Sequence, residues 1–122
     1  MRVGFGLVRT ATPEYLRFAA QFGATDISIN LNRADLPSAG GRWELQELVK
    51  LRQSVEMFGL KLSALENVPT DFYDHIMLGG ARRDEQIENM IYTVRNIARA
   101  GIPIFGYNWM PTNSWRTPSK QI

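Results

Sequence analysis

Cysteine is absent from this sequence, and histidine occurs once, at His75. Without cysteine there is no disulfide framework and no thiolate metal site. An excess of one charge is also missing, because 14 Lys and Arg residues stand against 12 Asp and Glu residues, a net charge of +2. So small an excess produces no basic field of the kind that attracts nucleic acid. We therefore expect no nucleic-acid partner.

Long apolar runs are lacking as well. No stretch approaches the roughly 20 residues that a membrane span needs. The start of the chain, with Arg2 and an apolar run interrupted by glycine, is a poor signal peptide. These absences predict a cytoplasmic protein that does not enter a membrane.

What the sequence does contain is a regular alternation of apolar segments. With 44% hydrophobic residues in 122, one domain with a buried core is expected. The pattern predicts strands at residues 2–8, 26–30, 60–64 and 102–105. It predicts helices from a cap at Thr12 to Gly23, over residues 43–58, and from a cap at Asp84 to Gly101. A further helical turn is expected near residues 73–78.

Strands that alternate with helices imply parallel pairing and right-handed crossovers. The order therefore predicts a parallel α/β fold. The segment 32–42, rich in Gly, Pro, Ser and charge, is long for a loop, which favours a functional or mobile role.

Polar side chains follow the ends of the predicted strands. Because the carboxyl ends of parallel strands share one rim, and ligands bind there, we expect these groups to form a site. A cation, amides, a carboxylate and aromatic rings suit a polyhydroxy acid, since Arg pairs with carboxylates and amides bond hydroxyls. The predicted substrate-binding residues are Arg9, Asn30, Glu66, Asn67, Tyr107, Asn108 and Trp109.

Each of these residues has a structural alternative. Arg9 could be a solvated cation at a strand end, Glu66 with Asn67 could cap a turn, and the two aromatic residues could pack. Asn30 and Asn32 could stabilise the start of the loop. Asp71, Asp74 and His75 could together hold a divalent ion. A solvated loop or helix start is the favoured interpretation of that cluster, so no metal ligand is assigned.

Several motifs in the second half of the chain resemble the mannonate dehydratase family over residues 60–117. The most specific is Tyr107-Asn108-Trp109-Met110-Pro111, and the segment 65–69, Leu-Glu-Asn-Val-Pro, is similar to the family's third strand and loop. The other matching pieces are Arg83-Asp84, Ile87-Glu88-Asn89, Val94-Arg95-Asn96, residues 98–102 and Trp115-Arg116-Thr117.

The resemblance implies a TIM barrel of the xylose-isomerase-like kind. A complete barrel takes about 250 residues, so we expect an α/β fold of parallel βα repeats that forms half of a TIM barrel, with four strands and three main helices. Residues 1–111 would form this partial barrel and residues 112–122 a polar tail.

For activity, the resemblance implies a hydro-lyase that converts D-mannonate into 2-keto-3-deoxygluconate in glucuronate (hexuronate) breakdown. The family's divalent metal, Mn or Fe, is held by His, Cys and Asp on later strands, and these ligands have no counterpart here. Gly106 and Ser114 stand where family members carry Cys and Asp. The chain alone is therefore expected to be inactive.

Two alternatives remain open. One is a sugar isomerase or epimerase on the same type of barrel. The other is a non-catalytic half-barrel that folds, binds or forms a homo-oligomer, because an open sheet exposes its edges.

Overall fold

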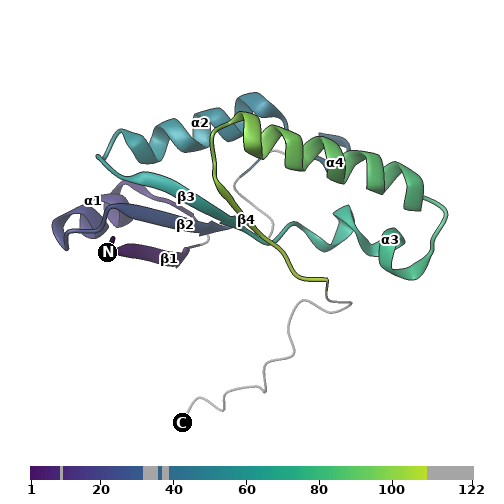
Figure 1. Cartoon of the computed structure of the whole chain (residues 1–122), viewed down its shortest axis with the longest axis horizontal. Coiled ribbons are helices and arrows are strands. Elements are labelled where there is room, and N and C mark those ends of the chain that lie inside the picture. The colour runs from purple at the N-terminus through teal and green to yellow at the C-terminus, as the bar shows by residue number, and fades with distance from the viewer. Residues whose placement is uncertain (9, 32–35, 37–38, 110–122) are drawn as a thin grey trace, which may run out of the picture.

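Four parallel strands form one sheet in the computed structural model, which describes residues 1–8, 10–31, 36 and 39–109 (Figure 1). The strands lie in the order in which they occur in the chain. They are β1 (Gly4–Val8), β2 (Asp26–Asn30), β3 (Lys61–Glu66) and β4 (Ile104–Gly106).

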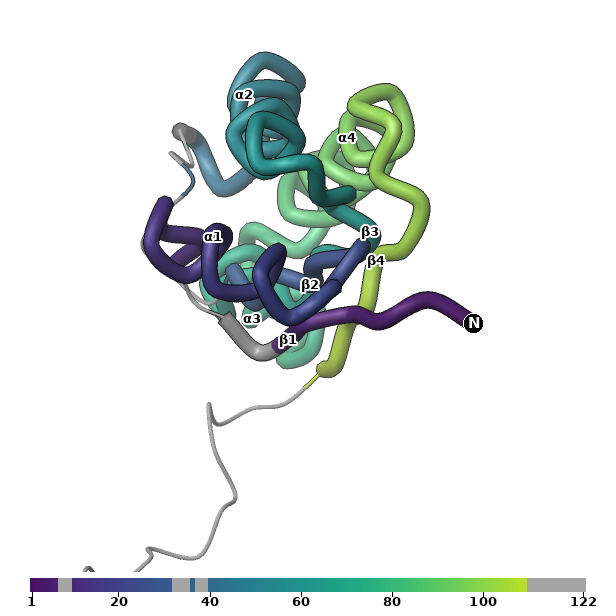
Figure 2. The backbone as a smooth tube through the Cα atoms, turned by 90° about the vertical axis from the view of Figure 1, so that its left-hand side faces the viewer, coloured from purple at the N-terminus to yellow at the C-terminus, as the bar shows by residue number. Residues whose placement is uncertain are grey.

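Three main helices connect the strands and lie on one side of the sheet (Figure 2). They are α1 (Pro13–Gln21), α2 (Leu45–Glu56) and α4 (Arg83–Arg99). Three short helices, η1 (Ala39–Gly41), η2 (Thr70–Phe72) and α3 (Asp74–Leu78), complete the described elements. Parallel strands in sequential order, joined by right-handed crossovers, place the three main connecting helices on the same face. This arrangement is that of a half-barrel, because a doubly wound sheet reverses its strand order.

The starts of the helices depend on different local chemistry. At α1 the Thr12 hydroxyl accepts the Tyr15 backbone N–H at 3.3 Å, and Pro13 occupies the first turn, as predicted. The cap predicted at Asp84 is wrong. Helix α4 begins at Arg83 after Arg82, which makes no side-chain cap, so Asp84 already lies in the first turn. There its negative charge still favours the positive end of the helix dipole.

The end of α4 follows the sequence prediction. Gly101 has φ = 76°, the left-handed conformation that glycine adopts without strain. The Ile102 N–H then bonds the Ile97 carbonyl at 3.2 Å, which satisfies an orphan carbonyl of the last turn. The chain leaves the helix there and turns into β4.

Strand β3 departs from the predicted alternation. Leu62 and Leu65 are both buried although they are three residues apart. The pairing with β2 shifts at this point, because Ile27 pairs with Leu62 but Ser28 pairs with Ala64. This irregularity inserts one residue, as a β-bulge does. The strand also continues to Glu66 instead of ending at Ala64.

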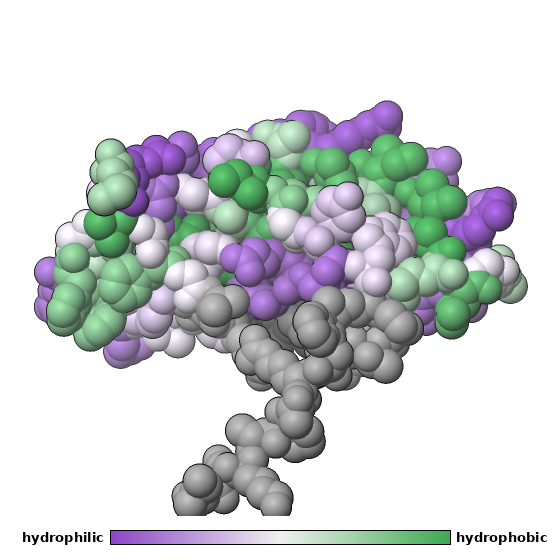
Figure 3. All heavy atoms as spheres, turned by 60° about the horizontal axis from the view of Figure 1, so that its bottom comes forward, coloured by the Kyte–Doolittle hydropathy of each residue, from purple (hydrophilic) through white to green (hydrophobic). Residues whose placement is uncertain are grey.

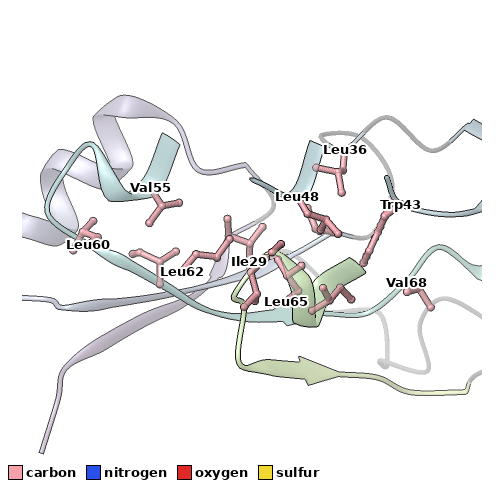
Figure 4. Close-up of a cluster of buried hydrophobic side chains, with 14 of the residues drawn as sticks. Ile29, Leu36, Trp43, Leu48, Val55, Leu60, Leu62, Leu65 and Val68 are labelled. Carbon is pink, nitrogen blue, oxygen red and sulfur yellow. The ribbon is translucent and has the colours of Figure 1, made fainter. Parts of the chain in front are cut away.

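The core lies between the sheet and the helices. Leu62 and Leu65 rise from β3 toward Val55 and Leu48 of α2 (Figure 4). The other large side chains with less than 2% exposure are Leu16, Ile27, Ile29, Trp43, Phe72, Thr93 and Asn96.

Trp43 was predicted within the second helix, but it precedes it. The ring is 1% exposed and packs on Phe72 with 5.7 Å between ring centroids. The Trp43 N–H donates to Thr93 Oγ1 at 3.2 Å, and Asn96 Nδ2 donates to the Trp43 carbonyl at 2.9 Å. Two buried polar side chains of α4 thus satisfy the backbone that leads into α2.

The opposite face of the sheet, here called the open face, carries small and polar residues. The strand residues between the buried core positions supply it, and Figure 3 shows a hydrophilic patch on this side of the molecule. The residues of the open face are Gly4, Gly6, Asp26, Ser28, Ser63 and Glu66. In a closed barrel this face would be the interior.

Asp26 is the most strongly bonded residue of the open face. Ser63 and Thr25 donate hydrogen bonds to its carboxylate, the latter at 2.6 Å, and Arg2 Nε lies 3.3 Å away. These hydrogen bonds, from Ser63 first and then Thr25, hold the pKa of Asp26 below its ordinary value. Asp26 is therefore charged and satisfied at the amino-terminal end of the strands.

Replacing Ser63 with alanine is expected to lower the free energy of unfolding in a pH-dependent way. A depressed carboxyl pKa stabilises the fold above the unfolded pKa of about 4, and the gain is lost as the pH falls through the folded pKa. The difference from wild type should be largest near neutral pH and shrink in acid. Urea unfolding over a pH series measures it, with Ser54→Ala on α2 as control, whose hydroxyl donates to the Leu51 carbonyl of its own helix. A difference that is the same at every pH would show that Ser63 acts through packing alone.

Candidate functional site at the carboxyl ends of the strands

The carboxyl ends of β2, β3 and β4 are joined by backbone pairing. Asn30 lies opposite Glu66, and Glu66 lies opposite Gly106. Beyond the ladder, the Leu31 N–H donates to the Glu66 carbonyl at 3.1 Å and the Asn67 N–H donates to the Gly106 carbonyl at 2.8 Å. These bonds fix the backbone positions from which the predicted site residues extend. The carboxyl end of the sheet is therefore held by hydrogen bonds across three strands.

Glu66 is held on the open face by β2. The Ser28 hydroxyl donates a hydrogen bond to Glu66 Oε1, and both side chains are half-buried. Within the part of the chain that the structure describes, Glu66 forms no ion pair. A carboxylate with one protein donor keeps acceptor capacity for a ligand, since each oxygen has two lone pairs.

Asn30 presents an unsatisfied acceptor. Its Oδ1 is buried, and no donor reaches it from residues 1–8, 10–31, 36 or 39–109. A buried polar atom without a partner costs about 1–3 kcal/mol. Since Asn30 pairs with Glu66 in the register of the two strands, this acceptor is a candidate partner for a ligand hydroxyl or a water at the rim.

Asn67 turns the chain away from the sheet. Its φ of 59° lies in the left-handed region, which asparagine tolerates better than most other residues with a side chain. The turn directs the next residues toward η2, so that Val68 and Phe72 are buried in the core. For Asn67 the structure thus shows a backbone role, while its substrate role stays a prediction.

The residues after β4 lie along a groove of about 330 Å³. The Tyr107 ring stacks on Phe105 with 6.2 Å between centroids, and the Trp109 ring contacts Tyr73 at 5.0 Å. The groove's lining is mostly apolar and includes side chains of α4; it is formed by Val68, Tyr73, Met90, Val94, Phe105, Tyr107, Asn108 and Trp109. The two aromatic rings therefore line an apolar groove that α4 also borders, whereas Glu66 faces the open side.

The structure thus brings together only part of the predicted site. Asn30, Glu66 and Asn67 are neighbours at the ends of β2 and β3, and Asn108 is exposed beside the groove. Arg9 and Asn32 lie outside the described residues. Ser28 was missed, although the alternation Ile27-Ser28-Ile29-Asn30 was the signal that could have placed it beside Asn30 on the polar face.

The acidic cluster near His75 is occupied by structural bonds. Asp74 accepts Gln86 Nε2 at 2.6 Å and the His75 N–H at 2.8 Å. The hydrogen bond from Gln86 is the main cause that lowers the pKa of Asp74. Gln86 Nε2 also donates to the Asp71 carbonyl at 2.9 Å, so these groups join α3 to α4. Helix α3 begins at Asp74, and this confirms the predicted helix start.

The described part of the chain offers neither a membrane span nor a metal site built from three ligands. None of its helices is long and apolar enough to cross a membrane. Its His, Asp and Glu residues form no group of three that could hold a metal ion.

The family model and several sequence relatives that this chain matches belong to one family. The family model described as D-mannonate dehydratase (UxuA) matches residues 5–121. A mannonate dehydratase of Thermotoga petrophila is 43% identical over 81 residues, which cover 66% of this chain and 22% of that protein. One of Streptococcus pneumoniae is 40% identical over the same share of this chain and 21% of its own length.

A solved structure agrees with the sequence relatives. The crystal structure of mannonate dehydratase from Streptococcus suis serotype 2 superposes with a TM-score of 0.72 at 30% identity, over 95% of this chain and 32% of that one. The present chain therefore spans about a fifth to a third of the length of the relatives it matches. Since the family match extends over nearly the whole chain and the fold agrees, this chain belongs to the D-mannonate dehydratase family.

Proposed function

We propose that residues 1–111 supply half of the barrel of a mannonate dehydratase, a cytoplasmic hydro-lyase that converts D-mannonate into 2-keto-3-deoxygluconate in glucuronate breakdown. The observation that carries this proposal is the pair of acceptors at the carboxyl ends of β2 and β3, Glu66 and Asn30 Oδ1, the latter without a donor among the described residues. In barrels of this type that end of the sheet is where substrates bind.

The reaction defines what such a half-barrel has to do. Dehydration removes the proton beside the carboxylate and the hydroxyl group of the next carbon, so the substrate must be held with both bonds in a fixed orientation. A sugar acid presents a row of hydroxyl donors, and the acceptors of Glu66 and Asn30 match them. Arg9 and Asn108 are the proposed partners for the remaining polar groups, with Tyr107 and Trp109 beside the carbon chain. Fixed orientation of this kind lowers the barrier by preorganisation.

The divalent metal, Mn or Fe, that the family resemblance implies does not fit the described residues. Among them no three His, Asp or Glu side chains converge, and Asp74 is already bonded to Gln86. We assign no step to the metal here and propose that its ligands lie on polypeptide outside these residues. The role of this chain is to bind and orient the sugar acid.

Assembly of a divided barrel tests the proposal. This chain is mixed with the part of the Streptococcus suis enzyme that follows its β4 equivalent, with Mn²⁺ present. We expect dehydration of D-mannonate by the mixture and none by either part alone, because the missing strands close the barrel. Formation of the 2-keto acid is measured by its reaction with semicarbazide, and complex formation by sedimentation.

The assay also separates the alternatives. A complex that forms but exchanges a ketose for an aldose, without dehydration, would favour the isomerase. A complex that forms and catalyses neither reaction would contradict the proposed function. The second candidate, a non-catalytic half-barrel, is favoured by one observation, the 57% exposure of Ile104 on the edge strand β4. Edge strands with exposed apolar residues commonly pair with another chain.

A further inference from the structure

Two serine–carboxylate pairs lie on the open face, and they differ in what else bonds the carboxylate. Asp26 receives hydrogen bonds from Ser63 and Thr25 and an ion pair from Arg2. Within the described part of the chain, the Glu66 carboxylate receives one hydrogen bond, from Ser28. The first carboxylate is saturated by the protein, and the second keeps acceptor capacity.

The position of Ser28 follows from its neighbours in β2. Ile27 and Ile29 are no more than 1% exposed and face the helices. Alternation along a strand then places Ser28 on the open face. Strand β2 pairs on both sides, with β1 and β3, so its backbone is well held. The hydroxyl therefore projects from a rigid place in the sheet.

The shift in β3 brings Glu66 to the same face. Because the extra residue lies between Leu62 and Leu65, Glu66 comes into register with Asn30 at the end of the sheet. The Ser28 hydroxyl holds Oε1 of Glu66, while no donor from the described part of the chain engages Oε2. This restrains a side chain that would otherwise sample several rotamers.

We propose that Ser28 is a positioning residue, which orients Glu66 so that Glu66 and Asn30 Oδ1 form a subsite for adjacent hydroxyl groups of the sugar acid. The subsite consists of acceptors with a negative charge, so it attracts hydroxyl donors and repels the substrate carboxylate. The substrate therefore binds with its carboxylate away from the ends of β2 and β3. This inference rests on the proposed function and adds the orientation of the substrate in that site.

The chain offers a matched control, since Ser28→Ala and Ser63→Ala each remove one serine bond to a carboxylate of the open face. In the assembled barrel, Ser28→Ala is expected to raise KM for D-mannonate about five- to tenfold, the effect of about one hydrogen bond, with little change in kcat. Ser28→Thr, which keeps the hydroxyl, should restore KM to near the wild-type value. Ser63→Ala should leave KM unchanged.

A second measurement does not depend on turnover. Scalar couplings of the Glu66 side chain in the isolated chain report whether it occupies one rotamer. We expect single-rotamer couplings in wild type and Ser63→Ala, and averaged couplings in Ser28→Ala. Equal couplings in wild type and Ser28→Ala would overturn the proposal, as would an equal rise in KM for both alanine variants. An assembled barrel that lacks dehydratase activity contradicts the proposed function instead, while the couplings still decide whether Ser28 positions Glu66.

Discussion

Trp43→Ala is expected to lower the free energy of unfolding by about 3–5 kcal/mol. The ring is 1% exposed and packs on Phe72, so its removal leaves a large cavity between α4 and the chain that leads into α2. Most small domains have only about 5–15 kcal/mol of stability. The variant should therefore unfold at a much lower urea concentration, followed by far-ultraviolet circular dichroism.

Two further variants make this result specific. Trp43→Phe keeps a ring and the backbone bonds to Thr93 and Asn96, so it should cost clearly less than alanine. Phe22→Ala removes an aromatic ring that is 66% exposed and should change stability by less than about 1 kcal/mol. Comparable losses for Phe22→Ala and Trp43→Ala would contradict the core described here.

Glu66→Ala is expected to reduce kcat/KM of the assembled barrel about ten- to hundredfold. A hydrogen bond to a charged group contributes about 1.5–3 kcal/mol, and each 1.4 kcal/mol changes the rate constant tenfold. The variant removes the only charged member of the proposed hydroxyl subsite and leaves Asn30 as its remaining acceptor. Steady-state kinetics with D-mannonate measure the loss.

The control for this variant is Glu88→Ala, because Glu88 is an exposed glutamate on α4. It should leave kcat/KM at the wild-type value, which shows that a general change of charge is not responsible. Glu66→Gln keeps the shape but loses the charge and should give an intermediate rate. Wild-type kcat/KM in Glu66→Ala would remove this residue from the proposed site.

Local patterns accounted for most elements of the fold. Proline after Thr12, glycine after the apolar repeat of α4, and short apolar runs between helices are signals that depend on near neighbours in the chain. The predicted helix boundaries failed where a residue's chemistry or spacing fitted a helix position that the structure assigns to another residue. Asp84 has the chemistry of a cap, but α4 begins one residue earlier, and Trp43 fits the helical period but is used for packing before α2.

The candidate site was harder to predict than the helices and strands, because it depends on contacts between residues that are far apart in the sequence. Glu66 and Asn30 were found because they follow apolar runs, but their contact with each other depends on the register of β3. The role of Ser28 depends on the same register, and a two-residue alternation cannot show an inserted residue. The sequence also could not show that the rings of Tyr107 and Trp109 contact Phe105 and Tyr73, and the substrate role of these two residues stays a prediction.

The sequence by itself determined the order of strands and helices, their parallel pairing and the family, because each of these follows from the types of residues and their spacing. Only the tertiary structure decided which polar groups meet. The irregular residue in β3 brings Glu66 to Ser28 and Asn30, while Asp26 is satisfied at the other end of the same face. The physical reason is that cross-strand register and side-chain contacts are long-range properties, set when the sheet packs against its helices.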